Sequence, residues 1–346
     1  MPTLTATERE RLLRLPKTEQ HLHFEAALPL SEAQARHGDV LRPVPPFWAP
    51  EFRYDDFAHF SQISRDYVFP SFQSPEDYLA LAGPIFKDIR AQNVRYLETS
   101  LNLFLLERHD FDLDVFIRAL RSEAPPDMDV RFYCGFRRNA YNGRLAGIID
   151  KAATSDEVAG LDLHGIESLP LEPWTAEVWA RAKACGKRNK AHAGEFCGPD
   201  GVRQVVADLK VDRVQHGVRA VESPDLVSRL AGEGVVLDLC PLSNLRLKVC
   251  PSIAAHPLRS LLTAGVRCTV NSDDPILFGN FITDDLAALV DEASFTFQEI
   301  VRILKVGWEE ADIDSGTRAR YMAELDAASA EADSRKSSTG VDPASG

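Results

Sequence analysis

The chain has 346 residues, with 39 basic and 52 acidic side chains and a formal charge of −13. This balance argues against a nucleic-acid partner, because binding a phosphate backbone requires clustered Lys and Arg. No run of about 18 apolar residues occurs and residues 1–20 lack an apolar core, so the sequence predicts neither a membrane span nor an export signal.

The cysteines give a further indication of the compartment. The chain has six of them, without CxxC or other paired spacing. Several lie in apolar segments, where a reduced thiol behaves as a small hydrophobic group. We therefore expect free cysteines and a cytoplasmic protein.

Apolar segments with the character of strands alternate along the chain with amphipathic segments of helical period. The expected strands are residues 18–24, 94–100, 130–136, 159–163, 189–194, 213–216, 235–240 and 267–271. The expected helices include residues 75–92, 115–124, 174–185, 201–209, 224–233 and 257–264. Eight such repeats predict a single (β/α)8 TIM barrel over residues 1–326, a fold that reaches about 250 residues or more as one unit.

Two regions fall outside this repeat. Residues 29–74 are too long for a connection between a strand and a helix, and they contain the Pro-rich, aromatic segment Arg42–Pro50. We expect an inserted helical or loop segment after the first strand, which either covers the barrel mouth as a lid or wraps the barrel side. Residues 327–346 are small and polar, which predicts a frayed helix end and a disordered tail.

Five polar motifs close five of the expected strands. They are His21-Leu22-His23, Leu163-His164-Gly165, His192-Ala193-Gly194-Glu195, Gln215-His216-Gly217 and Ser272-Asp273-Asp274-Pro275. Because the chemistry of a (β/α)8 barrel takes place at the carboxyl ends of its strands, these motifs are expected to meet at one mouth. In an extended strand residues i and i+2 share a face, so His21 and His23 project together.

These motifs contain the donors of a metal site. Three imidazoles and the Asp273 carboxylate form a set that zinc favours, and further acids and a further histidine are left for proton transfer. We predict one Zn²⁺ ion, with Fe²⁺ or Mn²⁺ as alternatives. Of the other histidines, His164 either lines the pocket or packs in the core, and four are expected at the surface: His37, His59, His109 and His256.

The chemistry of such a site is hydrolytic. A bound zinc ion lowers the pKa of water from 15.7 towards about 7. Attack of that water on an aromatic amidine carbon places charge on the neighbouring ring nitrogen, so the reaction needs a positioned acid. Glu195, three residues beyond His192, is well placed for this task. The nucleobase deaminases of another fold use a PCxxC zinc motif, which this chain lacks.

The order of the motifs HxH, HAGE, QHG and SDDP, found between Leu15 and about Phe278, resembles the adenosine and adenine deaminase family of the amidohydrolase superfamily. The resemblance implies a zinc-dependent purine 6-aminohydrolase, with a small 6-aminopurine and water as its partners. It also implies that the metal is bound by His21, His23, His192 and Asp273.

The same resemblance implies roles for the remaining site residues. Glu195 is expected to protonate the purine at N1, and His216 to orient the water and help to deprotonate it, with Asp273 as a further catalytic group. Asp274 is expected to face N7, and the backbone of Gly165 to contact N3.

The sequence signals for the substrate conflict. Glu25 stands at the position facing the ribose and, like the segment Cys240–Asn244, resembles the adenine-specific branch. Residues Asp162 to Glu167 instead resemble the nucleoside-binding Asp-Leu-x-Gly pattern. Because a buried Glu25 needs a hydroxyl or another donor, we expect a 6-aminopurine nucleoside, with adenosine as the default. The alternatives are adenine and 6-aminodeoxyfutalosine, whose carboxylate the pair Arg137-Arg138 would meet if these side chains are not simply solvated.

Two other classes of function stay open. A different amidohydrolase reaction, on a lactone, dipeptide or phosphotriester, uses the same barrel, because a fold does not fix a function. Those enzymes commonly have a modified lysine on the fourth strand, where this chain has Leu163 and His164. A non-catalytic binding protein is expected to have lost a metal ligand or Glu195, and all of these are present.

Overall fold

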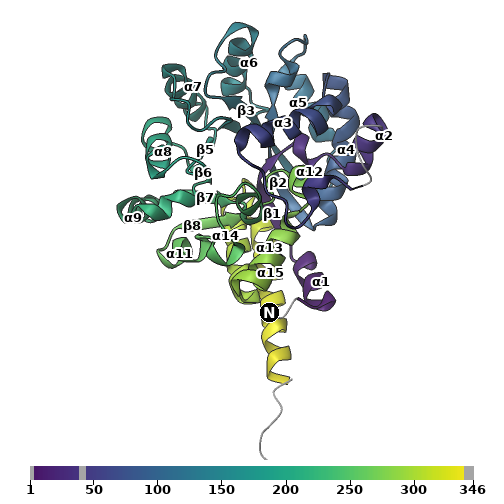
Figure 1. The fold of residues 1–346 in the computed structure, drawn as a ribbon, viewed down its shortest axis with the longest axis vertical. Coiled ribbons are helices and arrows are strands. Elements are labelled where there is room, and N and C mark those ends of the chain that lie inside the picture. The colour runs from purple at the N-terminus through teal and green to yellow at the C-terminus, as the bar shows by residue number, and fades with distance from the viewer. Residues whose placement is uncertain (1–3, 39–43, 339–346) are drawn as a thin grey trace, which may run out of the picture.

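Eight parallel strands surround a central axis in the computed structural model, which describes residues 4–38 and 44–338 (Figure 1). They pair in chain order and are β1 (Lys17–His23), β2 (Val94–Asn102), β3 (Asp129–Arg137), β4 (Gly160–His164), β5 (Lys190–Ala193), β6 (Arg213–His216), β7 (Val236–Leu239) and β8 (Arg267–Val270). Two 3.1 Å backbone hydrogen bonds, from Asp273 to the His21 carbonyl and from His23 to the Asp273 carbonyl, join the segment after β8 to β1. The predicted (β/α)8 barrel is confirmed, with strand bounds that differ from the expected ones by at most two residues.

Helices and short turns connect the strands around the outside of the barrel (Figure 1). The α-helices are α1 (Ala6–Arg14), α2 (Leu30–His37), α3 (Phe57–Tyr67), α4 (Pro75–Ala91), α5 (Leu113–Ser122), α6 (Gly143–Thr154), α7 (Pro173–Ala184), α8 (Pro199–Gln204), α9 (Pro224–Glu233), α10 (Pro241–Arg246), α11 (Leu258–Thr263), α12 (Pro275–Phe278), α13 (Ile282–Ala293), α14 (Phe297–Glu310) and α15 (Ser315–Ser338). The short 3-10 turns are η1 (Glu25–Ala27), η2 (Pro46–Trp48), η3 (Phe69–Ser71), η4 (Leu103–Leu106), η6 (Val218–Glu222) and η7 (Ile253–Ala255), and η5 (Val205–Leu209) is a short π-helix.

The local sequence explains where two of the longer helices begin. Ser74 and Asp77 cap the start of α4 reciprocally, and Pro75 occupies its first position. Thr296 and Glu299 form the same arrangement at the start of α14. These side chains satisfy backbone N–H groups that have no acceptor within the first turn of a helix.

The insertion after β1 lies over the barrel mouth. The indole Nε1 of Trp48, in η2, donates a 2.6 Å hydrogen bond to the Ile276 carbonyl in α12 and so fastens the turn there. Helix α3, which follows, lines the pocket described below. The insertion therefore has the position of a lid and also packs against the barrel. Residues 39–43, which include the start of the predicted Arg42–Pro50 loop, lie outside the described residues.

The last helix, α15, runs as far as Ser338 and extends away from the body of the barrel (Figure 1). The first part of the predicted tail, from Ala327 onwards, is therefore helical, and residues 339–346 are not described. The division of the chain at residue 326 stays a prediction.

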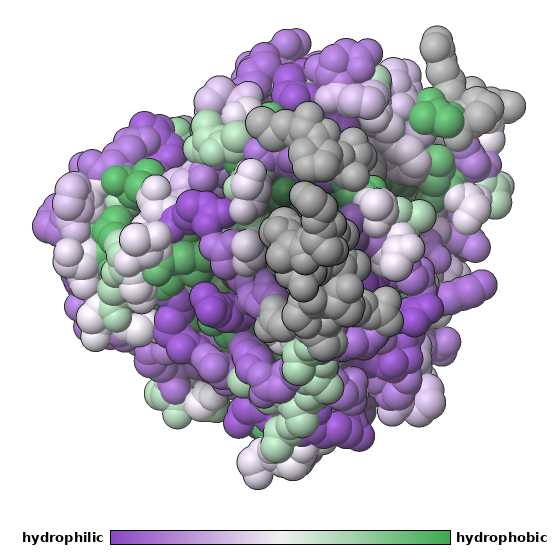
Figure 2. Space-filling model, turned by 90° about the horizontal axis from the view of Figure 1, so that it is seen from below, coloured by the Kyte–Doolittle hydropathy of each residue, from purple (hydrophilic) through white to green (hydrophobic). Residues whose placement is uncertain are grey.

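Polar side chains cover much of the surface. Most of the face in Figure 2 is hydrophilic, with smaller hydrophobic areas between the polar side chains. All six cysteines are free, as expected. Within the described ranges, none of the helices combines the length and the hydropathy that a bilayer span requires.

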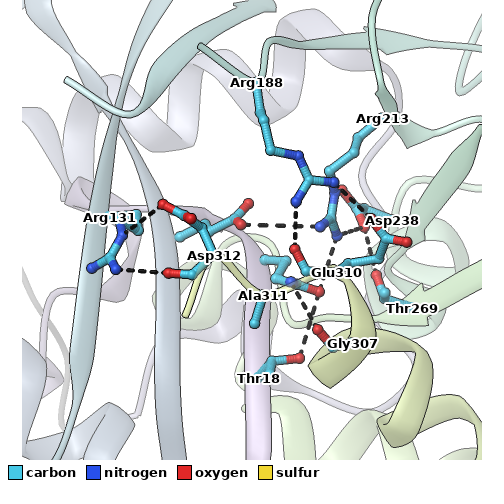
Figure 3. Close-up of polar contacts among 12 residues, drawn as sticks. Thr18, Arg131, Arg188, Arg213, Asp238, Thr269, Gly307, Glu310, Ala311 and Asp312 are labelled. Atoms are coloured by element: carbon cyan, nitrogen blue, oxygen red, sulfur yellow. Dashed lines mark hydrogen bonds and ion pairs between the residues drawn. The ribbon is translucent and has the colours of Figure 1, made fainter. Parts of the chain in front are cut away.

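A group of four charged side chains, here called the charge layer, fills the barrel interior: Glu98, Lys190, Arg213 and Asp238. Arg213 pairs with Asp238, which also accepts a 2.6 Å hydrogen bond from the Thr269 hydroxyl (Figure 3). Lys190 pairs with Glu98 at 2.5 Å. Because Lys190 and Arg213 begin their strands, the layer lies towards the amino-terminal end of the barrel.

Candidate active site

The four side chains predicted as metal ligands converge at the carboxyl end of the barrel. His21 and His23 lie on one face of β1, His192 lies on β5, and Asp273 follows β8. The Nε2 atoms of His21 and His23 are each 3.2 Å from His192 Nε2. They are 3.3 and 3.4 Å from Asp273 Oδ1. The structure thus brings the predicted set together around one point.

The hydrogen bonds of two rings show that their Nε2 atoms are free to bind a cation. His21 Nδ1 donates to the Asp238 carbonyl at 3.0 Å, and His192 Nδ1 donates to Asp162 Oδ1 at 3.1 Å. In a neutral imidazole the opposite nitrogen then carries a lone pair. Two lone pairs at 3.2 Å repel each other unless a cation lies between them, and tetrahedral ligands about 2.0–2.1 Å from zinc are about 3.3 Å apart. Because Asp273 Oδ1 is also buried without a hydrogen-bond partner, the residues fit a divalent ion.

His216 adjoins this centre. Its Nε2 atom lies 3.5 Å from Glu195 Oε1 and 3.9 Å from Asp273 Oδ2. A second combination of ligand atoms of suitable spacing therefore exists, in which His216 takes the place of His23 beside His21, His192 and Asp273.

Two acids of the mouth have pKa values above those of ordinary carboxyl groups. Burial, followed by the charges of Asp273 and Glu167, raises the pKa of Glu195 well above its ordinary value. Burial and the Asp273 charge do the same to the pKa of Asp274. A protonated carboxyl is the form that can deliver a proton or donate a hydrogen bond to a base.

Unusual backbone conformations direct these side chains into the mouth. His216 and Asp273 have φ values of 62° and 66°, in the left-handed region that residues with a Cβ seldom adopt. Gly194 also has a positive φ, and a Cβ there would lie 2.5 Å from Val202 Cγ2. Backbone strain of this kind clusters at functional sites.

Glu167, to which the sequence analysis gave no role, holds the turn that carries Glu195. Its carboxylate accepts hydrogen bonds from four consecutive backbone amides, those of Gly194, Glu195, Phe196 and Cys197. The amides of Phe196 and Cys197 lie 2.8 and 2.9 Å from the same oxygen. One side chain from the loop after β4 therefore fixes the loop after β5.

Groups of the protein itself donate hydrogen bonds to the Glu25 carboxylate, for which the sequence predicted a substrate hydroxyl as donor. One carboxylate oxygen accepts from the Tyr78 hydroxyl at 2.6 Å and from the Asn102 amide at 2.8 Å, and the other accepts from Asn102 Nδ2 at 2.7 Å. This argument for a nucleoside is therefore wrong, since both oxygens already have donors. Contact between Glu25 and the substrate stays a prediction.

A pocket of about 250 Å³ opens from the cluster towards the insertion. Most of the predicted site residues line it, namely His23, Glu25, Gly165, His192, Glu195, His216, Asp273 and Asp274. It is also lined by Arg65 of α3 and by Arg137, whose guanidinium lies 3.9 Å from the centre of the Phe104 ring. Among the residues that the structure describes, neither arginine forms an ion pair, and Arg65 donates to Gln62. Arg138 is buried and donates instead to the His192 carbonyl at 3.3 Å.

The structure also settles the environment of the remaining histidines. His164 lines the pocket, and its Nε2 atom is buried without a hydrogen-bond partner. The expectation that His256 lies at the surface is wrong, because it is 7% exposed and its Nε2 atom lies 3.0 Å from Asn244 Oδ1. Its place in a polar segment before a proline gave no indication of burial. His37, His59 and His109 are partly exposed.

Known proteins resemble this chain over most of its length. Residues 16–328 match the adenosine deaminase family. The chain is 30% identical to the aminodeoxyfutalosine deaminase of Streptomyces avermitilis over 90% of each chain. It is 33% identical to the adenine deaminase of Rhodospirillum rubrum, over 89% of this chain and 95% of the relative. The crystal structure of an amidohydrolase from Burkholderia ambifaria, with bound zinc, has a TM-score of 0.81 and 25% identity, covering 95% of this chain and 96% of the other.

These matches agree with the arrangement of the mouth, where imidazoles and buried carboxyl groups surround one point. The protein is a deaminase of the amidohydrolase superfamily, and it belongs to the adenosine deaminase family.

Proposed function

We propose that this enzyme hydrolytically removes the amino group of a 6-aminopurine nucleoside that carries an anionic group on its sugar side. The proposal rests on the lining of the pocket, which contains Arg65 and Arg137 as well as members of the His/Asp cluster. In a chain with a formal charge of −13, two arginines without acidic partners give the pocket a positive end. A carboxylate or phosphate would pair with such guanidinium groups.

The carboxylated nucleoside 6-aminodeoxyfutalosine has this chemistry, and the Streptomyces relative, itself an aminodeoxyfutalosine deaminase, supports it. Adenosine, the default from the sequence, then becomes the neutral reference substrate. The sequence-based argument for it depended on an unsatisfied Glu25, which the structure does not have.

One divalent ion would be bound by His21, His23, His192 and Asp273, and when bound it supplies the Lewis acidity that lowers the pKa of water. The zinc in the Burkholderia structure supports zinc. The same donors also suit Fe²⁺ or Mn²⁺, so elemental analysis has to identify the ion.

The side chains of the protein account for the proton movements. Glu195 donates its proton to purine N1 while the water oxygen adds to C6, so that negative charge does not build up on the ring. One proton of the water restores Glu195, and the other reaches the exocyclic nitrogen. The C6–N bond then breaks and ammonia leaves. Asp274 donates a hydrogen bond to N7, and the backbone of Gly165 contacts N3.

Ammonia release from adenine, adenosine, adenosine 5′-monophosphate and 6-aminodeoxyfutalosine tests the substrate class. We expect the highest kcat/KM for an anionic nucleoside. Arg65→Ala and Arg137→Ala should each lower that value by about tenfold or more, the worth of a charge-assisted hydrogen bond, and leave adenosine unaffected. Arg144→Ala removes an exposed arginine of α6 that pairs with Asp110, and serves as the control. Equal losses with adenosine would contradict the assignment of the positive end.

Adenine is the second candidate. Because Tyr78 and Asn102 satisfy Glu25, the pocket does not require a sugar hydroxyl. The Rhodospirillum relative, an adenine deaminase, supports this reading. It is correct if adenine is deaminated at least as efficiently as every nucleoside of the panel.

A further inference from the structure

We infer that a buried chain of hydrogen bonds, from the backbone of α11 through His256 and Asn244, fixes the tautomer of His216, so that this ring presents an N–H group to the pocket. The consequence for catalysis rests on the proposed function. The tautomer itself follows from the donors and acceptors along the chain, taken one after another.

The chain of hydrogen bonds begins at the backbone N–H group of Leu258. Leu258 is the first residue of α11, and its N–H has no acceptor within the helix. It donates to His256 Nδ1 at 3.2 Å. Burial lowers the pKa of His256 to about 4, so the ring is neutral at pH 7. An accepting Nδ1 carries no proton, and the proton of the ring therefore lies on Nε2.

His256 in turn fixes the orientation of the Asn244 amide. His256 Nε2–H donates to Asn244 Oδ1 at 3.0 Å. In the reverse orientation the Asn244 NH2 group would face the Nε2–H group, and two donors would meet at a residue that is 0% exposed. The amide oxygen of Asn244 therefore faces His256, and its NH2 group faces His216 Nδ1 at 3.3 Å.

The last member of the chain is His216. Because Nδ1 accepts from Asn244, the ring proton lies on Nε2, which is directed towards the pocket. Glu195 Oε1 and Asp273 Oδ2, at 3.5 and 3.9 Å from Nε2, are too distant for hydrogen bonds. An oxygen atom placed among these groups would accept a hydrogen bond from His216.

The position of this proton limits the role in catalysis that the sequence predicts for His216. His216 can orient the attacking oxygen by donating to it, but it cannot take up a proton at Nε2. The acceptor for the proton of the water is then a carboxylate, Glu195 or Asp273. Asn244 and His256 are positioning residues, since they act on the reaction only through His216.

Nitrogen NMR of the metal-loaded enzyme with ¹⁵N-labelled histidine reads the tautomer directly. The His216 signals are those lost in His216→Ala, and we expect a protonated Nε2 and an unprotonated Nδ1. Asn244→Asp keeps the size of the side chain but offers only acceptors, so the proton should move to Nδ1. Its kcat should fall about 10–100-fold, as for other partners that orient site residues, with unchanged KM and metal content.

A second variant tests the hydrogen bond between His256 and Asn244. His256→Phe should free the Asn244 amide to turn, give a mixture of His216 tautomers and lower kcat. His59→Phe is the matched control, because His59 Nδ1 also accepts from a backbone amide, that of Asp55 at 3.2 Å, and does not line the pocket. We expect the control to change neither tautomer nor kcat.

A proton on Nδ1 of His216 in the unmodified enzyme would overturn the inference, and so would an Asn244→Asp variant with unchanged tautomer and kcat. The NMR measurement needs no substrate. A protein that shows the expected tautomer but deaminates none of the purines would therefore refute the proposed function alone.

Discussion

Two polar clusters lie inside the same barrel, and they differ in how their charges are balanced. In the charge layer, two cationic side chains face two carboxylates in ion pairs, and the four residues are at most 2% exposed. The mouth instead gathers several acids around the imidazoles of His21, His23, His192 and His216. There Asp273 Oδ1 and Glu195 Oε1 are buried without hydrogen-bond partners.

The difference separates a structural cluster from a functional one. Breaking a buried ion pair is costly, so the charge layer, whose two cationic side chains pair with its two carboxylates, contributes to the fold. Under the proposed function, the mouth is completed by a cation, water and a substrate. The two clusters are also connected through Asp238. Its carboxylate is held by Arg213 and Thr269 (Figure 3), and its backbone carbonyl accepts a hydrogen bond from His21 Nδ1.

The largest effect is expected from changing Asp273, the anionic member of the proposed metal site. Asp273→Asn should lose the divalent ion and lower kcat/KM by more than about a thousandfold, since a Lewis acid supplies several kcal/mol of stabilisation. Elemental analysis and ammonia release measure both effects. His216→Ala is the comparison variant, which should keep most of the ion and lose turnover. A stoichiometric ion in Asp273→Asn would show that the mouth does not depend on this carboxylate for its cation.

The next largest effect is expected from changing Glu195, the proposed proton donor. Glu195→Gln should keep the metal and lose at least about a hundredfold in kcat, the lower range of general acid–base catalysis. Asp200→Asn, which changes an exposed acid of α8, should leave kcat unaffected. Near-normal turnover of Glu195→Gln would show that another group protonates the purine.

A smaller loss is expected for the residue that holds the Glu195 turn. Glu167→Gln replaces one acceptor oxygen by an NH2 group, so it cannot serve all four amides, and kcat should fall about tenfold as the acid is misplaced. Hydrogen exchange of residues 194–197 should become faster. Glu172→Gln, an exposed change in the same loop, is the control. If kcat falls without faster exchange, Glu167 acts by its charge and not by holding the turn.

The smallest effect on activity is expected in the charge layer. Burial by itself raises the pKa of Glu98, but Lys190 and Arg213 outweigh it and lower the pKa to about 2. This lies below the ordinary value of about 4.3, so the charged Glu98 stabilises the fold above that pH, and the stabilisation is lost as the pH falls towards the folded-state pKa.

Glu98→Gln leaves the buried cations Lys190 and Arg213 without this carboxylate, so it should lower the free energy of unfolding by about 3–5 kcal/mol at pH 7. Little change in kcat is expected. Below pH 4.3 its free energy of unfolding should fall less steeply than that of the unmodified protein. Urea unfolding between pH 7 and pH 3 measures both quantities. Equal slopes below pH 4.3 would mean that this ion pair does not set the acid stability.

The sequence by itself determined the barrel and the convergence of His21, His23, His192 and Asp273 at its mouth, because both depend on short-range patterns. Alternation along an extended strand places His21 and His23 on one face in any tertiary structure. Repeated strand and helix segments predict a parallel ring, whose carboxyl ends carry the remaining motifs to one mouth. These features could therefore be predicted without knowing how any distant segments pack.

Only the tertiary structure decided which partners serve each buried polar group. Glu25 receives its donors from Tyr78 and Asn102, far away in the sequence, so its need for a substrate hydroxyl could not be judged beforehand. His256 was expected at the surface, yet its ring is buried against Asn244. Hydrogen-bond satisfaction depends on atoms brought together by packing, and no periodicity or motif spacing reports it.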